Sequence, residues 1–263
     1  MVRFMLRSSS PSVSARVRRW AAVAGVALVV TACSGDGAER PSATDTQETP
    51  GSTAATTGAV DSRPGLAAGE DFSVAAALGE IPDALFYGAA IIVGAGDLDA
   101  ATAVAGTERP TSDDAEDFTV WANSITARGA FADRGAFVAL PQLLLDAGLP
   151  TDPAAYEAAL GWSIRGADAF VGALQGSGEL AVVTGDFDAD TLADELVSVG
   201  KGVVSLGDGD DLEQDLQEPT PLNRFGYPTR LATRGRAIAL SPLTDPVVDW
   251  LDGTGGTLAE DDD

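Results

Sequence analysis

The chain has 263 residues with 40 acidic and 16 basic side chains, a formal net charge of −24, one cysteine and no histidine. The absence of histidine excludes Ser-His-Asp and Cys-His catalysis and zinc sites of the HExxH type. The excess of negative charge repels phosphate groups and excludes nucleic acid as a partner. No motif indicates a cofactor, and none is expected.

Residues 1–32 have the composition of a cleaved export signal. Five arginines and no acidic residue precede an apolar run over 20–31. A membrane-spanning helix needs about 20 apolar residues, so this run is too short to remain as a span. A short buried helix is the alternative, but the basic residues before the run and the polar residues after it disfavour that interpretation.

The signal ends in Val30-Thr31-Ala32-Cys33, which resembles the lipobox of bacterial lipoproteins. The resemblance implies cleavage before Cys33 and a diacylglyceryl thioether on its sulfur, which would anchor the protein to the extracytoplasmic face of the cell membrane. Two or three acyl chains hold a protein at a bilayer where one does not, so membrane contact is expected through this lipid. The Arg18-Arg19 pair leaves both the general secretory and the twin-arginine export routes open, although its neighbours fit the second poorly.

Composition divides the remainder into a linker, a domain and a tail. Residues 33–70 contain almost no large apolar residue, cannot bury enough surface to offset their ordering entropy, and are predicted to form a disordered linker. Residues 71–253 are long enough to enclose one core and form the predicted domain. Residues 254–263 form a solvated acidic tail. Without residues 1–32 the chain carries 11 basic and 40 acidic side chains, a net charge of about −29.

The domain alternates between helical and strand patterns. Helices are predicted over 72–78, 100–105, 113–128, 153–160, 189–199 and 246–252, and strands over 85–93, 137–140, 169–174, 180–184, 203–206, 230–233 and 237–241. In the third of these helices, Phe118, Trp121 and Ile125 share one face. The glycine-containing loops at 175–178 and 234–236 indicate two hairpins. Strands paired locally but separated by helices favour a single α+β domain with a mixed, mainly antiparallel sheet.

A GDxD sequence occurs twice, as GDLDAAT at 96–102 and as GDFDADT at 185–191. Each copy follows a predicted strand and precedes a predicted helix, which indicates two strand–GDxD–helix repeats. Asp99 and Asp188 are predicted to be N-caps whose carboxylates accept hydrogen bonds from free backbone N–H groups. Asp152 and Asp245, each followed by proline, are predicted to cap two further helices. In the alternative, the four GDxD aspartates form a cation site or an acid–base pair, but no further ligand type is in register.

Asp208, Asp210 and Asp211 are weak candidates for a calcium site. A calcium loop of the helix-loop-helix type needs an oxygen ligand at its fifth position and glycine at its sixth, where this chain has Leu212 and Glu213. The segment is therefore expected to be a solvated loop, and no metal site is predicted. No residue is assigned a catalytic role.

Residues 81–251 resemble a family of uncharacterised lipoproteins of high-GC Gram-positive (actinobacterial) bacteria. The resemblance rests on the sequences GDLDAATAVAG, TDPAAYEAALGWS, VVTGDFDADTL and AIALSPLTDPV. The family has no established activity, so the resemblance implies a location but no chemistry. Its members often extend further, which is consistent with this chain being a shortened copy.

Two hypotheses of function follow, from different classes. The first is a non-enzymatic binding module, held at the cell envelope by the lipid on Cys33, that binds an envelope protein or a ligand. The alternative is a carboxylate-dependent hydrolase acting on cell-wall glycan, which would need two carboxylates facing each other about 5 to 9.5 Å apart across a long groove. The lack of a nucleophile motif favours binding.

Overall fold

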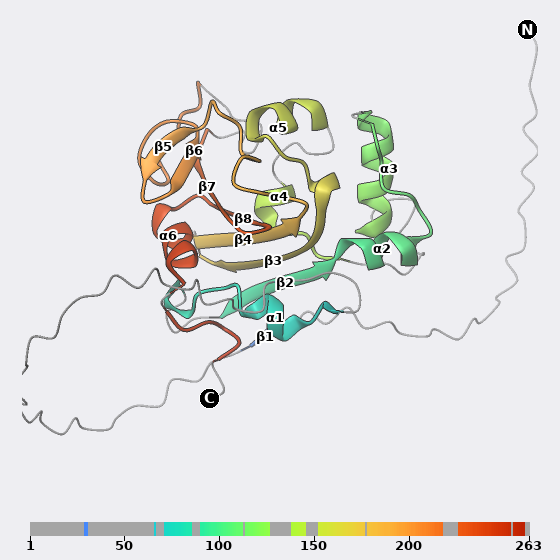
Figure 1. Ribbon diagram of the computed structural model, residues 1–263, viewed down its shortest axis with the longest axis horizontal. Helices are drawn as coiled ribbons and strands as arrows, with labels where there is room; N and C mark the ends of the chain where they lie inside the picture. Colours follow the sequence, from blue (N-terminus) through green and yellow to red (C-terminus); the bar gives the residue numbers. More distant parts are fainter. Residues whose placement is uncertain are drawn as a thin grey trace, which may run out of the picture.

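The computed structural model describes residues 29–30, 66, 71–85, 90–112, 114–126, 138–145, 152–176, 178–217, 226–253 and 255–260. Within these ranges the strands form one sheet in the order β1-β2-β3-β4-β8-β7-β6-β5, with helices on both of its sides (Figure 1). Every described pair of neighbouring strands is antiparallel. The protein is therefore an α+β protein, as the alternation of patterns predicts, but its described sheet is antiparallel throughout and not mixed.

The bounds of the elements follow the chain. The strands are β1 (Val29–Val30), β2 (Ile91–Asp97), β3 (Ala167–Gln175), β4 (Gly178–Gly185), β5 (Val197–Gly200), β6 (Val203–Leu206), β7 (Thr229–Arg234) and β8 (Ala237–Ser241). The helices are α1 (Val74–Leu78), α2 (Leu98–Ala105), α3 (Ala115–Ile125), α4 (Gln142–Leu145), α5 (Pro153–Leu160) and α6 (Thr244–Asp252). Short 3-10 turns cover Asp83–Leu85 and Ile164–Gly166.

Both predicted hairpins are confirmed. Gln175 pairs with Gly178 at the turn between β3 and β4, and Arg234 pairs with Ala237 at the turn between β7 and β8. Gly235 in the second turn has a φ of +61°, in the left-handed region that glycine adopts without strain. The two hairpins join side by side through β4 and β8, which makes the central part of the sheet.

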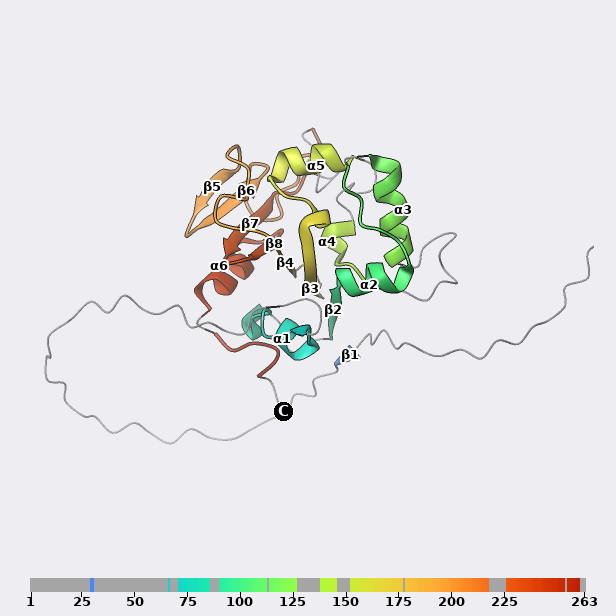
Figure 2. The ribbon, with the colours of Figure 1, turned by 45° about the vertical axis from the view of Figure 1, so that its right-hand side comes forward.

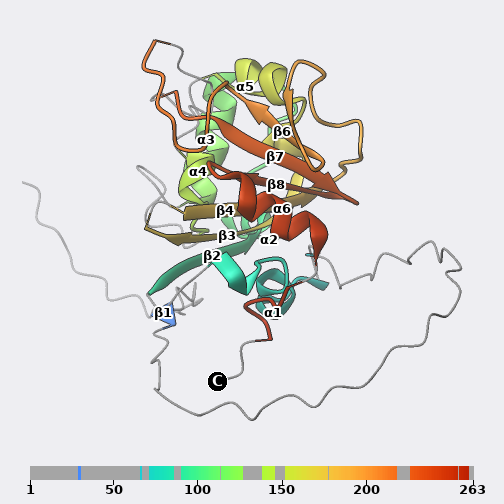
Figure 3. The same ribbon diagram turned by 90° about the vertical axis from the view of Figure 1, so that its left-hand side faces the viewer.

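The sheet carries a hydrophobic core on each face. On one face, cluster one contains Phe118, Trp121 and Ile125 of α3 and Tyr156 of α5. On the other face, cluster two contains residues from the segments around α1 and α6, including Trp250. Figures 2 and 3 show α2, α3 and α4 on one side of the sheet and α1 and α6 on the other. Because side chains alternate along a strand, β3 supplies both clusters, which makes the sheet the buried middle layer.

Strand β2 lies later in the chain than the predicted strand over 85–93. Leu85 belongs to a 3-10 turn, and the strand begins at Ile91 and continues to Asp97. It passes through two glycines because their neighbours leave no room for a side chain. A Cβ at Gly94 would lie 2.8 Å from the carbonyl oxygen of Ala139, and one at Gly96 would lie 2.8 Å from the ring of Phe170. The glycines in the sequence indicated that the strand ends before them. In the structure the strand continues, because close packing requires glycine at both positions.

The second GDxD copy is not followed by the predicted helix over 189–199. Residues 186–196 form turns, and Val197–Gly200 form β5, which pairs with β6 through a tight turn at Lys201 and Gly202. Leu192 packs on cluster one from within these turns, and the N–H of Ala193 donates to the carbonyl of Leu160 at 3.0 Å. The apolar residues that suggested a helix are thus used by a loop and an edge strand.

Three further segments differ from the predictions. Residues 138–140 are not a strand, and the N–H of Val138 donates to the carbonyl of Ile125 at the end of α3 (3.0 Å). Part of the predicted solvated tail is packed, because Thr257 is buried and bridges to Pro82. Leu66, inside the predicted linker, is buried in cluster two. In each case a tertiary contact overrides the local composition.

Candidate functional site

The two GDxD turns lie at the same end of the sheet. Asp97, at the end of β2, pairs with Ala169, and Gly185, at the end of β4, pairs with Ala167. Since β2 and β4 both run antiparallel to β3, their ends flank the beginning of β3. We call the region formed by residues 97–99, 167–169 and 185–188 the GDxD edge.

In the first turn the helix cap is Asp97, and the prediction of Asp99 is wrong. The N–H of Ala100 donates to Oδ1 of Asp97 at 2.8 Å. Because β2 extends to Asp97, helix α2 begins at Leu98 and the capping position falls two residues earlier than predicted. Asp99 instead accepts a hydrogen bond from Nη2 of Arg109 at 2.7 Å.

Replacing Asp97 by alanine is expected to lower the free energy of unfolding by about 1 kcal/mol, because it removes the cap of α2. Asp97→Asn should cost less, since the amide oxygen still accepts. Asp99→Ala is the matched control and should change stability by less than about 0.5 kcal/mol, because the Asp99 side chain is 61% exposed. Urea unfolding midpoints rank the stabilities of the three variants. A larger loss of stability for Asp99→Ala than for Asp97→Ala would contradict the assignment of Asp97 as the cap.

In the second turn Asp188 stabilises a loop and caps no helix, which corrects the prediction. Its Oδ1 accepts from the N–H of Asp190 (3.0 Å) and from Oγ1 of Thr191 (3.0 Å). Oγ1 of Thr191 in turn accepts from the N–H of Asp188 at 2.8 Å. The carboxylate does bind a backbone N–H two residues on, but the bond closes a turn.

Asp168, which the sequence analysis did not single out, lies between the two turns. Nη2 of Arg236 is 3.6 Å from Oδ2 of Asp168 and 3.9 Å from Oδ1 of Asp186. Burial raises the pKa of Asp168, the negative charge of Asp99 raises it further, and Arg109 and Arg236 partly oppose both effects. The available signal was a charged residue inside an otherwise apolar strand sequence.

An open groove of about 580 Å³ lies beside the GDxD edge. Its walls come from 110–111 after α2, from α5 and the segment 161–166, and from the second turn over 186–191. Arg165 pairs with Glu157 across the groove wall. The acidic side chains of Asp186, Asp188 and Asp190 therefore remain in excess, which makes the groove repulsive to anions.

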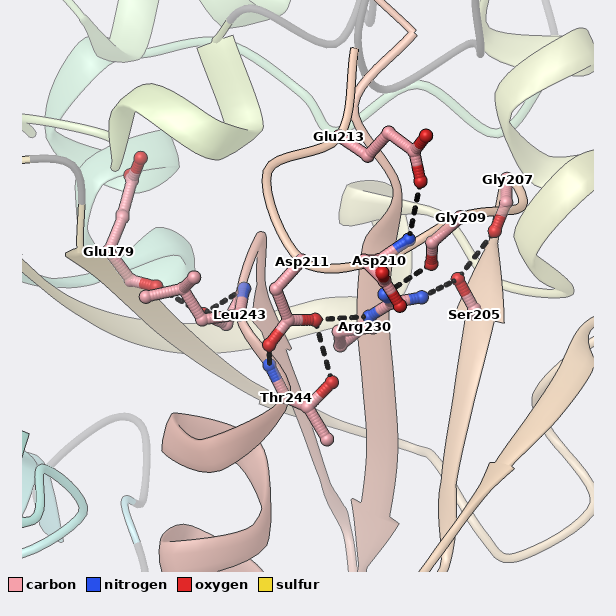
Figure 4. A network of polar contacts seen from close by, with 11 residues as sticks. Glu179, Ser205, Gly207, Gly209, Asp210, Asp211, Glu213, Arg230, Leu243 and Thr244 are labelled. Atoms are coloured by element: carbon pink, nitrogen blue, oxygen red, sulfur yellow. Dashed lines mark hydrogen bonds and ion pairs between the residues drawn. The ribbon is translucent and has the colours of Figure 1, made fainter. Parts of the chain in front are cut away.

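The predicted loop aspartates belong to a different region, shown in Figure 4. Arg230 of β7 is buried and donates to Oδ1 of Asp211 (2.9 Å), to Oγ of Ser205 (2.6 Å) and to the carbonyl of Gly209 (2.8 Å). Asp211 also accepts from the N–H and from Oγ1 of Thr244, both at 2.7 Å. The loop is thus tied to β7 and to the first turn of α6.

This arrangement corrects the prediction that Asp245 caps the last helix. The N-cap residue of α6 is Leu243, which has no side-chain capping bond, and Asp245 lies within the first turn. Asp211 reaches this helix end from 33 residues earlier in the chain. By contrast, Asp152 caps α5 as predicted and accepts from the N–H of Ala155 at 3.0 Å.

The remaining predicted site residues are placed as follows. Asp208 and Asp210 are exposed in the loop, and the N–H of Asp210 donates to Glu213 at 2.9 Å. Among the described residues, no group of three or more acidic, cysteine or histidine side chains is arranged to hold a metal ion. Cys33 lies outside the described residues.

Comparison with known proteins found no matching family model, no similar curated protein and no similar solved structure. None of the helices in the described part of the chain is long and apolar enough to cross a membrane.

Proposed function

We propose that the protein is an extracytoplasmic lipoprotein, anchored through Cys33, that acts as a non-enzymatic binding module of the cell envelope. The placement of the only cysteine at the end of a short apolar run supports the anchor. The sequence predicts a disordered linker over 33–70, a range in which the structure describes Leu66 alone, and such a linker would hold the domain roughly 30 Å from the bilayer. We also propose that the chain belongs with the uncharacterised actinobacterial lipoproteins that its sequence resembles.

The observation that carries the binding function is the open groove beside the GDxD edge. It is assembled from three separate segments of the chain. Several of its polar groups already hold the local structure, since Asp188 binds Thr191 and Glu157 binds Arg165. A concave surface lined by acidic and aromatic side chains from three segments is the kind of site that binds small molecules.

The anchor is tested by replacing Cys33 with serine. Because the thioether forms on the cysteine sulfur, Cys33→Ser should abolish incorporation of labelled fatty acid and leave the precursor uncut at this position. The protein should then move from the detergent phase to the aqueous phase. Ser34→Ala, one residue beyond the cleavage position, is the control and should be labelled normally. Equal detergent partitioning of Cys33→Ser and the unmodified chain would contradict the anchor.

The second candidate function, a hydrolase acting on cell-wall glycan, is favoured by one observation. Asp168 has a raised pKa and lies near Asp186 on the other side of Arg236. A carboxyl group of raised pKa beside a second carboxyl group is a feature of glycoside hydrolases, in which the first acts as the general acid. The position of Arg236 between them disfavours this function, because its positive charge favours the ionised form of Asp168, which would have to be protonated to act as the acid. Release of soluble sugar from cell-wall preparations, lost in Asp168→Asn, would support it.

A further inference from the structure

Two unpaired polar atoms lie in the aromatic cluster beside the groove. Trp162 meets Tyr156 and Phe187 edge-on, with both pairs of ring centroids 5.7 Å apart. In the part of the chain that the structure describes, Oη of Tyr156 and Nε1 of Trp162 are the buried side-chain polar atoms without a hydrogen-bond partner. Tyr156 is 0% and Trp162 is 2% exposed. Burial raises the pKa of the Tyr156 hydroxyl, so it remains protonated and able to donate.

The other two described tryptophans show that this arrangement is specific to Trp162. Nε1 of Trp121 donates to Oγ1 of Thr102 at 3.0 Å, and Nε1 of Trp250 donates to Oε2 of Glu80 at 2.8 Å. A buried donor without an acceptor is costly, so such atoms in folded proteins usually meet water or a ligand. Trp162 and Phe187 both line the groove. An acceptor that enters the groove is therefore the natural partner for the indole N–H.

The chemistry of the groove restricts what can bring that acceptor. Asp186, Asp188 and Asp190 accept hydrogen bonds and repel anions. A metal ion or an ammonium group would satisfy these carboxylates but has no lone pair to accept the N–H of Trp162. A hydroxyl group does both, because it donates to a carboxylate and accepts from an indole. The complementary ligand is neutral and carries several hydroxyl groups.

We propose that this groove binds a neutral oligosaccharide. One sugar oxygen accepts from Nε1 of Trp162, and neighbouring hydroxyls donate to Asp186 and Asp190. The indole N–H is covered in the free protein, so part of the groove wall must shift to admit the sugar oxygen. We assign this shift to the turn over 186–191, which carries Phe187, a groove residue packed edge-on against Trp162. This turn contains neither helix nor strand, which makes it the wall that can move at least cost. The proposal rests on the proposed binding function and names its ligand class.

The test uses the mature lipoprotein, purified in a detergent without a sugar headgroup. Binding of a chitin tetrasaccharide and of maltotetraose is measured by calorimetry and by tryptophan fluorescence, with spermidine and Ca²⁺ as cationic probes. At least one tetrasaccharide should bind. Trp162→Phe, which keeps an aromatic ring but removes the N–H, should weaken that binding about tenfold. Trp121→Phe is the matched control and should leave the affinity unchanged.

A second variant keeps the test valid if Trp162→Phe is poorly folded. Asp190 is exposed, so Asp190→Asn should fold normally and weaken sugar binding several-fold, whereas Asp208→Asn in the distant loop should not. The proposal would be overturned if neither tetrasaccharide binds, or if only spermidine or Ca²⁺ binds. The labelling of Cys33 is measured on the same preparation. Normal labelling without sugar binding rejects the ligand class alone, and lost labelling rejects the anchor alone.

Discussion

Replacing Glu80 by alanine is expected to lower the free energy of unfolding by about 3 kcal/mol. Glu80 follows α1, is 4% exposed, and accepts two hydrogen bonds on Oε2. One comes from Nε1 of Trp250 at 2.8 Å and the other from Nη2 of Arg234 at 2.6 Å. Removing the carboxylate leaves both donors unpaired beside cluster two. The loss therefore includes an uncompensated charge as well as two missing bonds.

The contacts between Arg234 and Trp250, the two partners of Glu80, explain why the effect should be large. The guanidinium group of Arg234 lies 4.2 Å from the ring centroid of Trp250 and also donates to the Trp250 carbonyl. Glu80 thus connects the end of α1 to β7 and α6, and its partner Arg234 lies 154 residues further along the chain. Its replacement should loosen the packing of α1 on the sheet.

Urea unfolding followed by tryptophan fluorescence measures this loss. Glu80→Gln should cost less, because its amide oxygen still accepts from Trp250 although the charge is gone. Glu108→Ala is the control for removing an exposed acid and should be nearly neutral. If the free energies of unfolding of Glu80→Ala and Glu108→Ala lie within about 0.5 kcal/mol of each other, the contacts among Glu80, Arg234 and Trp250 do not stabilise the fold.

Elements with local signals could be predicted from the sequence. Helix α5 has its cap Asp152, a first-turn proline and the terminating Gly161, whose φ is +82°, all within ten residues. In α3 the periodic face of Phe118, Trp121 and Ile125 is buried as predicted. The two hairpins have short glycine-containing turns. Each of these features depends on neighbours in the chain, so a sequence pattern is enough to find it.

Features set by distant contacts could not be predicted in this way. Strand β2 continues through Gly96, where the ring of Phe170 of β3 leaves no room for a side chain, and that extension moves the cap from Asp99 to Asp97. The two GDxD copies have nearly the same sequence but different continuations, because the second supplies a loop that packs on α5. The candidate site shows the same limit. The two acidic GDxD turns could be recognised in the sequence. The groove, and the position of Trp162 in its wall, arise only where three segments of the chain meet.

The buried Arg230 gives the second large expected effect. Arg230→Ala should lower the free energy of unfolding by about 3 kcal/mol, because the side chain is 4% exposed and makes three hydrogen bonds, two to the loop around Asp211 and one to Ser205 of β6. Arg230→Lys keeps the charge but not the planar fork that reaches three acceptors at once, so it should recover only part of the loss. Arg236→Ala, at an exposed arginine, is the control for removing positive charge.

The pH dependence of this loss separates the ion pair from simple packing. Burial by itself raises the pKa of Asp211, but the hydrogen bonds from Thr244 and Arg230, together with the charge of Arg230, lower it below its usual value. A carboxyl whose folded-state pKa is lowered contributes stability above its unfolded pKa of about 3.9, and that contribution is lost as the pH falls through the folded value. The loss in free energy of unfolding caused by Arg230→Ala should therefore be constant from about pH 7 to pH 5 and should become smaller below about pH 4.

Urea unfolding of the unmodified protein and of Arg230→Ala across this pH range measures the loss. If the loss in free energy stays constant down to pH 3, Arg230 stabilises the protein through packing and through its hydrogen bonds to Ser205 and Gly209. Asp211 would then stabilise the start of α6 through Thr244 without a contribution from the ion pair.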